Sequence, residues 1–409
     1  MIAAFVVAAT LALAQQQQSD STYSTAAVRA LVERAAVVNR AVPARLAGYR
    51  AHIEAEVAIV THQPNGTEGA VQVEQTANEA RWSRDGAYEQ HVVGYRARML
   101  GPSVSLLSSL RYSWTVPTLY GNRIDLFFGR DTTRRPQPRR DRAPRYRAVH
   151  PFATDRESVY RFSGGDTVSR LTINGHRVTV ARVHVEPLAV PRSSPTAPTI
   201  AFAGDVDVDL GRAQIVSMRG RFLELVPRPQ GAMARVLNST VRGIAYVELS
   251  SAEVDARFWL PAYQRVELQA STLFSDARGI IRIVSRFSEY SVDTAATIAL
   301  ADGPDSLVPR PHRLTWAPRD SIDRYSARGG TWRRAQGDET SRANGDDFAD
   351  IAPPDLRPTG PPEFGLRAHR FSNVFHANRV EGAYTGYGAE LRLRDLAPGV
   401  TIRGQAGWA

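Results

Sequence analysis

Residues 48–60 read GYRAHIEAEVAIV, and this stretch decides the fold class. Apolar and polar side chains alternate along it with a period of two, which is typical of a β-strand buried on one face. Turn chemistry follows at Asn65-Gly66. We take the apolar set as a candidate ligand face for an acyl chain or a partner segment. That face carries Ile53, Val57 and Ile59, and the opposite face carries Arg50, His52, Glu54 and Glu56.

The same alternation recurs along most of the chain. Two further segments, 71–82 and 88–98, are separated by Asp85-Gly86, so the first three strands are predicted to form an antiparallel meander. Apolar residues at a spacing of three to four predict one helix over 24–40, before the first strand. More alternating segments continue to residue 290. The sequence therefore predicts a mainly β (α+β) fold, with a large, curved antiparallel sheet over residues 24–293 and an N-terminal helix.

Composition restricts the chemistry. The chain has 409 residues, 43% of them hydrophobic, which suffices for a real core. It has no cysteine, which excludes disulfides, thiolate metal sites and thiol nucleophiles. All 51 basic residues are arginine, and the net charge is +10. Residues 130–147 hold eight arginines and two aspartates, and so carry +6 of that charge. We interpret this stretch as a solvated Pro/Arg-rich loop between strands, and keep contact with lipid or lipopolysaccharide phosphates as the alternative. With one aromatic residue, Tyr146, in a chain that we expect to be exported, it does not predict nucleic-acid binding.

The N-terminus resembles an export signal. Residues 2–14 form an uncharged apolar run of thirteen residues that ends in Ala12-Leu13-Ala14, an A-x-A cleavage pattern. Thirteen residues cover only about 20 Å as a helix, which is too short to span a bilayer. We therefore expect a signal peptide over 1–14, with Ala12 and Ala14 at the cleavage site, and an exported protein.

Residues 294–370 differ from what precedes them. Nine prolines fall between 301 and 363, with many Asp and Arg and no sustained periodicity. This composition predicts a Pro/Arg-rich linker, with Tyr325 and Trp332 docking locally.

The last forty residues, 371–409, regain a period of two. Two segments of about ten residues flank the turn sequence DLAPG at 395–399, each with one apolar face and one charged or small face. This is the pattern of a transmembrane β-hairpin, although a soluble hairpin with one wet face has the same pattern. Because an open hairpin leaves unpaired edges, we expect the 409 residues to be a fragment that holds only the start of an outer-membrane barrel. The lipid-facing candidates are Tyr387, Leu391, Leu393, Val400, Ile402 and Trp408.

Residues 376–388, HANRVEGAYTGYG, resemble the N-R-V-E-G-x-x-x-G pattern that opens the barrel in an uncharacterised family of Gram-negative outer-membrane proteins. Those proteins place a periplasmic β domain, similar to Lol-type lipoprotein carriers, before an integral barrel. The resemblance implies a location in the outer membrane with a periplasmic domain, and it implies no chemistry. The matching residues are Asn378, Arg379, Val380, Glu381, Gly382 and Gly386.

No motif predicts catalysis, a cofactor or a metal. There is no H-E-x-x-H, no G-x-S-x-G and no phosphate loop. His52, His62 and His91 fall on or near neighbouring strands, and we interpret them as exposed strand histidines. Asp205, Asp207 and Asp209 alternate with apolar residues, which indicates the wet face of a strand rather than a calcium loop.

Three functions remain open. The first is a non-enzymatic outer-membrane protein, with a periplasmic β domain and a barrel, that acts in envelope transport or assembly with lipid, lipopolysaccharide or lipoprotein as partner. The second is a soluble periplasmic carrier of lipid or lipoprotein. The third, weaker one is an envelope hydrolase, for which the sequence offers no catalytic residues.

Overall fold

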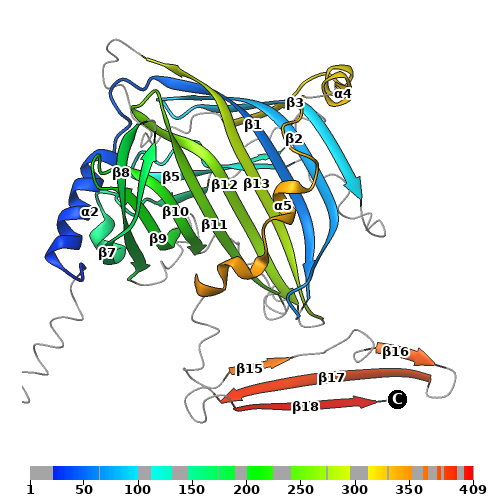
Figure 1. Cartoon of the computed structure of the whole chain (residues 1–409). Coiled ribbons are helices and arrows are strands. Elements are labelled where there is room, and N and C mark those ends of the chain that lie inside the picture. Colours follow the sequence, from blue (N-terminus) through cyan, green and yellow to red (C-terminus); the bar gives the residue numbers. More distant parts are fainter. Residues whose placement is uncertain are drawn as a thin grey trace, which may run out of the picture.

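An antiparallel sheet dominates the computed structural model (Figure 1). The structure describes residues 22–63, 65–99, 112–130, 146–173, 175–188, 200–223, 241–272, 275–294, 312–328, 331–351, 363–366, 375–378, 382–393 and 400–408. Eleven strands form the main sheet in the order β14-β3-β2-β1-β13-β12-β11-β10-β9-β8-β7. They are β1 (Gly48–His62), β2 (Glu68–Ser83), β3 (Tyr88–Met99), β7 (Tyr160–Ile173), β8 (His176–Pro187), β9 (Ala201–Asp209), β10 (Ile215–Leu223), β11 (Val241–Val254), β12 (Phe258–Thr272), β13 (Ser275–Asp293) and β14 (His312–Trp316).

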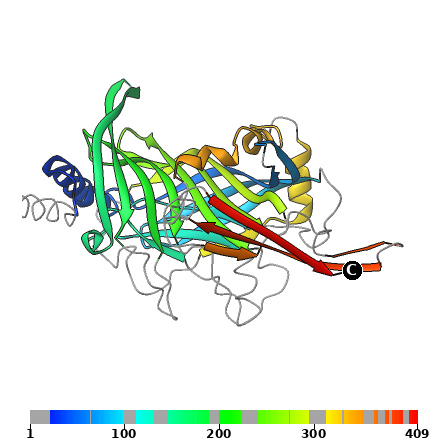
Figure 2. The ribbon, with the colours of Figure 1, turned by 90° about the horizontal axis from the view of Figure 1, so that it is seen from below.

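The mainly β fold class is confirmed, including the β1–β2–β3 meander. Strand β1 pairs with β2 along its whole length, from Gly48 opposite Ser83 to His62 opposite Glu68. The predicted helix is α2 (Ala26–Asn39), which Thr25 caps by accepting a hydrogen bond from the Val28 amide at 3.1 Å. Its apolar side packs against β7, and Figure 2 shows it at that end of the sheet. The turn between β11 and β12 interrupts the alternating segments, and its residues Asp255 and Ala256 both have positive φ.

Pairing between strands far apart in sequence joins the two halves of the sheet. Strand β13 pairs antiparallel with β1, so Gly48 lies opposite Asp293 and Val57 opposite Ile283. All other neighbours from β7 to β13 are consecutive in sequence. The chain therefore forms two meanders, β1–β3 and β7–β13, that join along β1 and β13.

A second, smaller sheet covers the inner face of the main sheet. It consists of β4 (Tyr112–Thr115), β5 (Arg123–Arg130) and β6 (Tyr146–Val149). Figure 1 shows β5 passing behind the main sheet. The largest apolar cluster includes Trp114 and Ile124 of the smaller sheet, Phe202 of the main sheet and Phe152 from the turn after β6.

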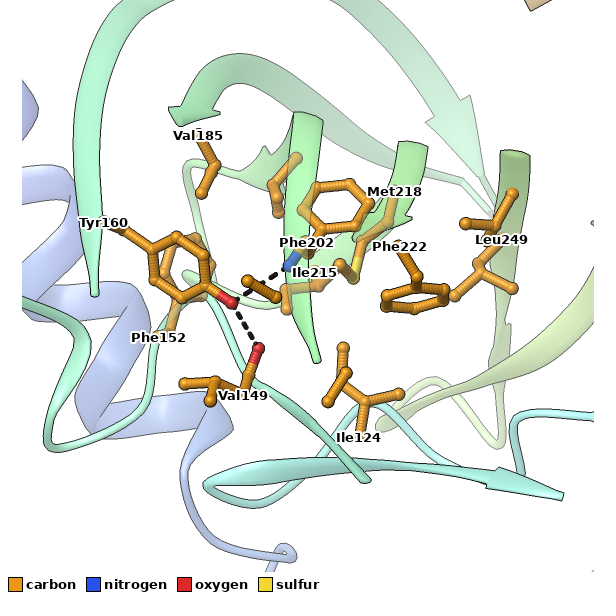
Figure 3. Close-up of a cluster of buried hydrophobic side chains, with 14 of the residues drawn as sticks. Ile124, Val149, Phe152, Tyr160, Val185, Phe202, Ile215, Met218, Phe222 and Leu249 are labelled. Atoms are coloured by element: carbon orange, nitrogen blue, oxygen red, sulfur yellow. Dashed lines mark hydrogen bonds between the residues drawn. The ribbon is translucent and has the colours of Figure 1, made fainter. Parts of the chain in front are cut away.

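One tyrosine joins the layers of this core (Figure 3). The Tyr160 hydroxyl donates to the Val149 carbonyl at 2.6 Å and accepts from the Phe202 amide at 3.1 Å. Burial of this ring raises the pKa of the Tyr160 hydroxyl well above its ordinary value. The hydroxyl therefore stays protonated, and its two hydrogen bonds link β6 to β9 inside an apolar environment. Helix η2 (Arg156–Ser158) lies between β6 and β7.

The segment predicted to be a linker instead contains folded elements. Strand β14 adds to the edge of the main sheet, parallel to β3, and α4 (Arg319–Ala327) packs on β3. Helices α5 (Asp338–Ser341) and η3 (Gly345–Ile351) lie on the outer face of the sheet (Figure 1). Docking of α4 uses a glycine: a Cβ on Gly94 would lie 2.4 Å from the Tyr325 ring. Tyr325 and Trp332 do dock locally, as edge-to-face rings 5.6 Å apart. The β domain thus extends to Ile351, because side-chain docking rather than periodicity orders this segment.

The C-terminal strands form a separate four-stranded sheet. It contains β15 (Glu363–Leu366), β16 (Phe375–Asn378), β17 (Gly382–Leu393) and β18 (Val400–Trp408). Strand β17 pairs antiparallel with the three others.

Several sequence predictions fall outside the described residues. They are the signal peptide over 1–14 with Ala12 and Ala14, and residues 131–145 of the arginine-rich loop. Among the described residues, no helix is long and apolar enough to cross a membrane.

A glycine pair allows close packing between β9 and β10. Gly204 lies opposite Gly220, and a Cβ on Gly220 would lie 2.2 Å from the Ala203 carbonyl oxygen and 2.6 Å from the Phe202 ring. Gly220 therefore makes room for Phe202, which packs edge-to-face on Phe222 at 5.9 Å.

We predict that Gly220→Ala lowers the free energy of unfolding by about 1–3 kcal/mol, because the added methyl group overpacks the core. Gly69→Ala is the control, since its Cβ would make an ordinary 3.4 Å contact with Thr61. Urea denaturation of both variants tests this, and equal stability of the two variants would contradict it.

Candidate functional site

The inner apolar face carries the predicted ligand-facing residues. Ile53 and Val57 are buried, at 0% and 5% exposure, and Ile59 is half-buried. Ile53 belongs to the same apolar cluster as Phe127 of β5, and Val57 to the same cluster as Trp114 of β4. The three predicted residues do share one face. In the described part of the chain, however, the smaller sheet covers that face.

Specific hydrogen bonds hold this cover in place. The Gln264 side chain of β12 accepts from the Val116 amide at 2.8 Å and donates to its carbonyl at 2.7 Å. Buried His150 accepts from the Phe152 amide through Nδ1, and its Nε2 lies 3.1 Å from the Leu119 carbonyl. Burial lowers the pKa of His150 to about 4, so the ring is neutral near pH 7. An apolar ligand at this face would have to displace β4 and β5.

The outer face of the same sheet is polar and nevertheless buried. Arg282 of β13 donates to Glu267 of β12 at 2.5 Å and, through both terminal nitrogens, to Glu68 of β2 at 2.8 and 3.0 Å. Arg265 donates to the same Glu267 at 2.9 Å. Glu267 is 0% exposed and Arg282 only 1%. We call these four residues the charge network.

Residues Gly337–Ile351, which we call the strap, cover this face. The Glu56 carboxylate accepts from the Gly337 amide at 2.8 Å and from both the amide and the hydroxyl of Thr340, at 2.8 and 2.5 Å. Glu68 of the charge network accepts from the Gly345 amide at 2.7 Å. The sheet thus presents carboxylates to the backbone N–H groups of the strap, as a capping side chain does at a helix start.

Arginines of the sheet bind carboxylates of the strap in turn. The pairs come from three strands, and their N···O distances lie between 2.6 and 2.8 Å. They are Arg219–Asp350, Arg265–Asp347, Arg278–Asp346 and Arg286–Glu339.

Phe348 is the aromatic contact of the strap. Its side chain is 1% exposed and stacks on Tyr246 of β11, with ring centres 5.0 Å apart and an interplanar angle of 7°. The guanidinium carbons of Arg265 and Arg219 lie 4.7 and 5.5 Å from the ring centre. The ring therefore lies in an aromatic and cationic pocket on the sheet.

Hydrogen bonds lower the pKa of one carboxyl of the sheet and of one carboxyl of the strap. Burial raises the pKa of Glu68, but hydrogen bonds from Arg282, Gly345 and His62 outweigh burial and hold the pKa below its ordinary value. The hydrogen bond from Arg219 lowers the pKa of Asp350. Both groups therefore stabilise the folded state when they are ionised.

The histidines do not converge. His52 contacts Glu79 at 2.9 Å, His91 contacts Thr315 at 2.9 Å, and His62 lies between Glu68 and Asp346 at 3.1 and 3.3 Å. His52 and His62 are buried rather than exposed, because the outer face is covered. Among the described residues, no group of three or more His, Asp or Glu side chains could hold a metal ion.

The aspartates of β9 behave as a polar strand face. Arg182 donates to Asp207 at 2.8 Å, and His184 contacts Asp205 at 2.9 Å. That hydrogen bond raises the pKa of His184. Asp209 is buried and accepts from the Gly211 amide at 2.8 Å, which closes the turn after β9.

The C-terminal residues form the predicted hairpin. Strand β17 places Tyr387 opposite Ala406, Leu391 opposite Ile402 and Leu393 opposite Val400. Leu391 and Leu393 are half-buried, whereas Ile402 is 54% and Trp408 82% exposed. Of the barrel-start motif, Asn378 pairs with Gly382, and Gly386 pairs with Gly407. Arg379, Val380 and Glu381 lie outside the described residues.

No protein-family model and no curated protein matches the chain. Among solved structures, one of lipid–protein interactions in lipovitellin is similar at 10% identity with a TM-score of 0.22, over 61% of this chain. The match spans only 26% of the lipovitellin chain. MucB in complex with MucA(peri) is similar at 12% identity with a TM-score of 0.16, over 66% of this chain and 100% of MucB. Similarity at this level establishes neither a shared ligand nor a shared partner.

The sequence alone does not predict the charge network or the strap. A period of two assigns Glu54 and Glu56 to a polar face, but it does not show what covers that face. One signal was present: the strap holds five acidic residues and one arginine, in a chain of net charge +10.

We predict that Arg282→Met lowers the free energy of unfolding by about 3 kcal/mol or more, because Glu68 and Glu267 lose a buried cation. The control is Arg319→Ala, whose side chain is 92% exposed and 3.8 Å from Asp323, and it should leave stability unchanged. Urea denaturation measures both, and a stable Arg282→Met variant would contradict the role of the network.

We also predict that Glu68→Gln lowers the melting temperature at pH 7, and that its difference from the wild type narrows in acid. The folded-state pKa of Glu68 is below its ordinary value of 4.5. Its stabilisation is therefore complete above that value and is lost as the pH falls through the lower, folded-state pKa. Melting curves from pH 7 to pH 3 test this. A difference that stays constant over this range would count against it.

Proposed function

We propose that this chain is a non-enzymatic protein of the Gram-negative envelope, in which a periplasmic β domain precedes a C-terminal hairpin that enters the outer membrane. The observation that carries the proposal is the exposure of Ile402 and Trp408 on β18, at 54% and 82%. With Leu391 opposite Ile402, these side chains lie on one face of the hairpin, and a contiguous exposed apolar face of this kind suits lipid or a partner.

The lengths of the two strands support insertion into lipid. Strand β17 has 12 residues and β18 has 9. At about 3.3 Å per residue, strands of this length suit the roughly 30 Å hydrocarbon core of a bilayer. Leu391 lies opposite Ile402 in the register, so the hairpin brings these two residues of the candidate lipid-facing set side by side.

The sequence adds independent support for the location. The apolar run at 2–14 with its A-x-A end favours export, and the motif at 378–386 resembles the barrel start of outer-membrane proteins with a Lol-like domain. We therefore place the protein in envelope transport or assembly, with outer-membrane lipid as its first partner and lipopolysaccharide or lipoprotein as candidate cargo.

The soluble-carrier alternative is less well supported. A carrier needs an accessible apolar face, whereas Ile53 and Val57 are buried in the same clusters as side chains of β4 and β5. The hydrolase alternative has no catalytic arrangement among the described residues to support it.

We predict that the full chain binds vesicles of outer-membrane lipids and that Ile402→Asp reduces this binding, because a charge on the apolar face is costly in lipid. Val37→Asp is the matched control, since Val37 on α2 is 62% exposed and far in sequence from the hairpin. Flotation of the protein with vesicles measures binding. Equal flotation of the Ile402→Asp variant and the wild type would refute the proposal.

The position of Trp408 gives a second readout of the same proposal. Lipids brominated on their acyl chains should quench the fluorescence of the wild type more strongly than that of a Trp408→Phe variant, because only the wild type places this indole at the membrane.

A further inference from the structure

The sheet face beneath the strap is rich in polar and charged side chains. The charge network lies there with Glu56 and Gln269, next to a small apolar cluster of Ala58, Val60, Val73 and Ile280. Arg265, Glu267, Arg282 and Glu68 also bind one another without any group from the strap. Lifting the strap would therefore leave the charge network paired and open to water, and would expose Tyr246 and the small apolar cluster at Ile280 beside it. The face is thus preformed, and the fold of the sheet does not depend on the strap as it depends on an apolar core.

The strap, for its part, is held as a peptide ligand is held. In the part of the chain that the structure describes, it forms no strand pairing with the sheet, and its two short helical turns are docked by side chains. Asp347 is 47% exposed, whereas its partner Arg265 is 5% exposed. Asp350 is 63% exposed and its partner Arg219 is 31% exposed. In these two pairs the sheet side is more buried than the strap side, as expected for a short ligand on a built surface.

Charge complementarity matches the two sides. The strap contains Asp338, Glu339, Asp346, Asp347 and Asp350 against Arg342 alone. It meets four sheet arginines, from β10, β12 and β13. Arginine favours planar, charge-assisted contacts with carboxylates, so these four arginines favour binding of an acidic segment.

A single aromatic anchor sets the register. Phe348 lies between two aspartates that each bind an arginine, Asp347 to Arg265 and Asp350 to Arg219, and its ring stacks on Tyr246. A buried aromatic group surrounded by charged contacts is the usual form of a binding hot spot.

We propose that the outer face of β1 and β10–β13 is a recognition site for an acidic polypeptide segment with a phenylalanine anchor, and that the strap fills this site in cis. The partner is a segment of another protein with the chemistry of residues 346–350, D-D-F-A-D. Such a segment binds when the strap is displaced, so the strap is an internal competitor. This site is on the face opposite to the apolar one and does not depend on the membrane hairpin.

A peptide exchange assay on the full chain tests this site. The probe is a fluorescent peptide of residues 337–351, and the strap-weakened variant carries Phe348→Ala and Asp350→Asn, which leave every sheet residue unchanged. The peptide should bind the strap-weakened variant. It should bind the wild type about tenfold or more weakly, because the intact strap occupies the site. Fluorescence anisotropy measures both.

Peptide and sheet variants supply the matched controls. A peptide with Phe348→Ala should bind the strap-weakened variant about tenfold or more weakly than the native peptide. Adding Arg219→Gln to the strap-weakened variant should also weaken binding, because Asp350 of the peptide loses its partner. Circular dichroism checks the fold, and if the double variant is not folded, Asp350→Asn alone replaces it.

Two results would overturn the proposal. The first is a folded strap-weakened variant that does not bind the peptide. The second is equal binding of the peptide to the variant and to the wild type, which would place the peptide elsewhere. Neither result bears on vesicle binding by the hairpin.

Discussion

Arg282 is the contact on which the outer face of the sheet depends. It lies on β13 at the centre of the sheet. It binds Glu267 on the neighbouring strand β12 and Glu68, the first residue of β2. Burial alone would lower the pKa of this guanidinium, but the two carboxylates outweigh burial and raise it. A buried cation of this kind is stable only with both partners in place. The same two residues also fix the position of the strap. Glu68 accepts a hydrogen bond from the Gly345 amide, and Arg282 donates one to the Thr340 carbonyl.

The sheet is therefore covered on both faces by different chemistry. Apolar clusters and the β4–β5–β6 sheet cover the inner face, and hydrogen bonds between charged side chains and the strap cover the outer face. An apolar cover is released only at the cost of exposing hydrocarbon, whereas a charged cover can be replaced by water or by another charged segment. This difference explains why exchange of a ligand is proposed on the polar face, and not on the apolar one.

Local periodicity is enough to predict the long strands β1, β2 and β3, the helix α2 and the β17–β18 hairpin, but not the short strands β4, β6 and β14. Tyr49, Ile53 and Val57 alternate with His52, Glu54 and Glu56, and the structure places the two sets on opposite faces. The linker prediction differs from the structure because the strap is ordered by contacts with residues 53 to 284 positions away, such as Arg286 with Glu339 and Glu56 with Thr340. No local pattern in an Asp-rich and Arg-rich stretch reports such partners. The pairing of β1 with β13 was beyond sequence reasoning for the same reason.

Hydrogen exchange at the strap amides tests most directly whether the strap is a separately docked segment. In the wild type, the Thr340 and Gly345 amides should be protected, but they should exchange faster than the amides of β1 and β13, since the strap opens while the sheet stays folded. Glu56→Gln should speed exchange at Gly337 and Thr340 and leave β13 unchanged. Exchange of strap and sheet at one common rate, with Glu56→Gln affecting both alike, would show that the strap is an inseparable part of the fold and would contradict this account.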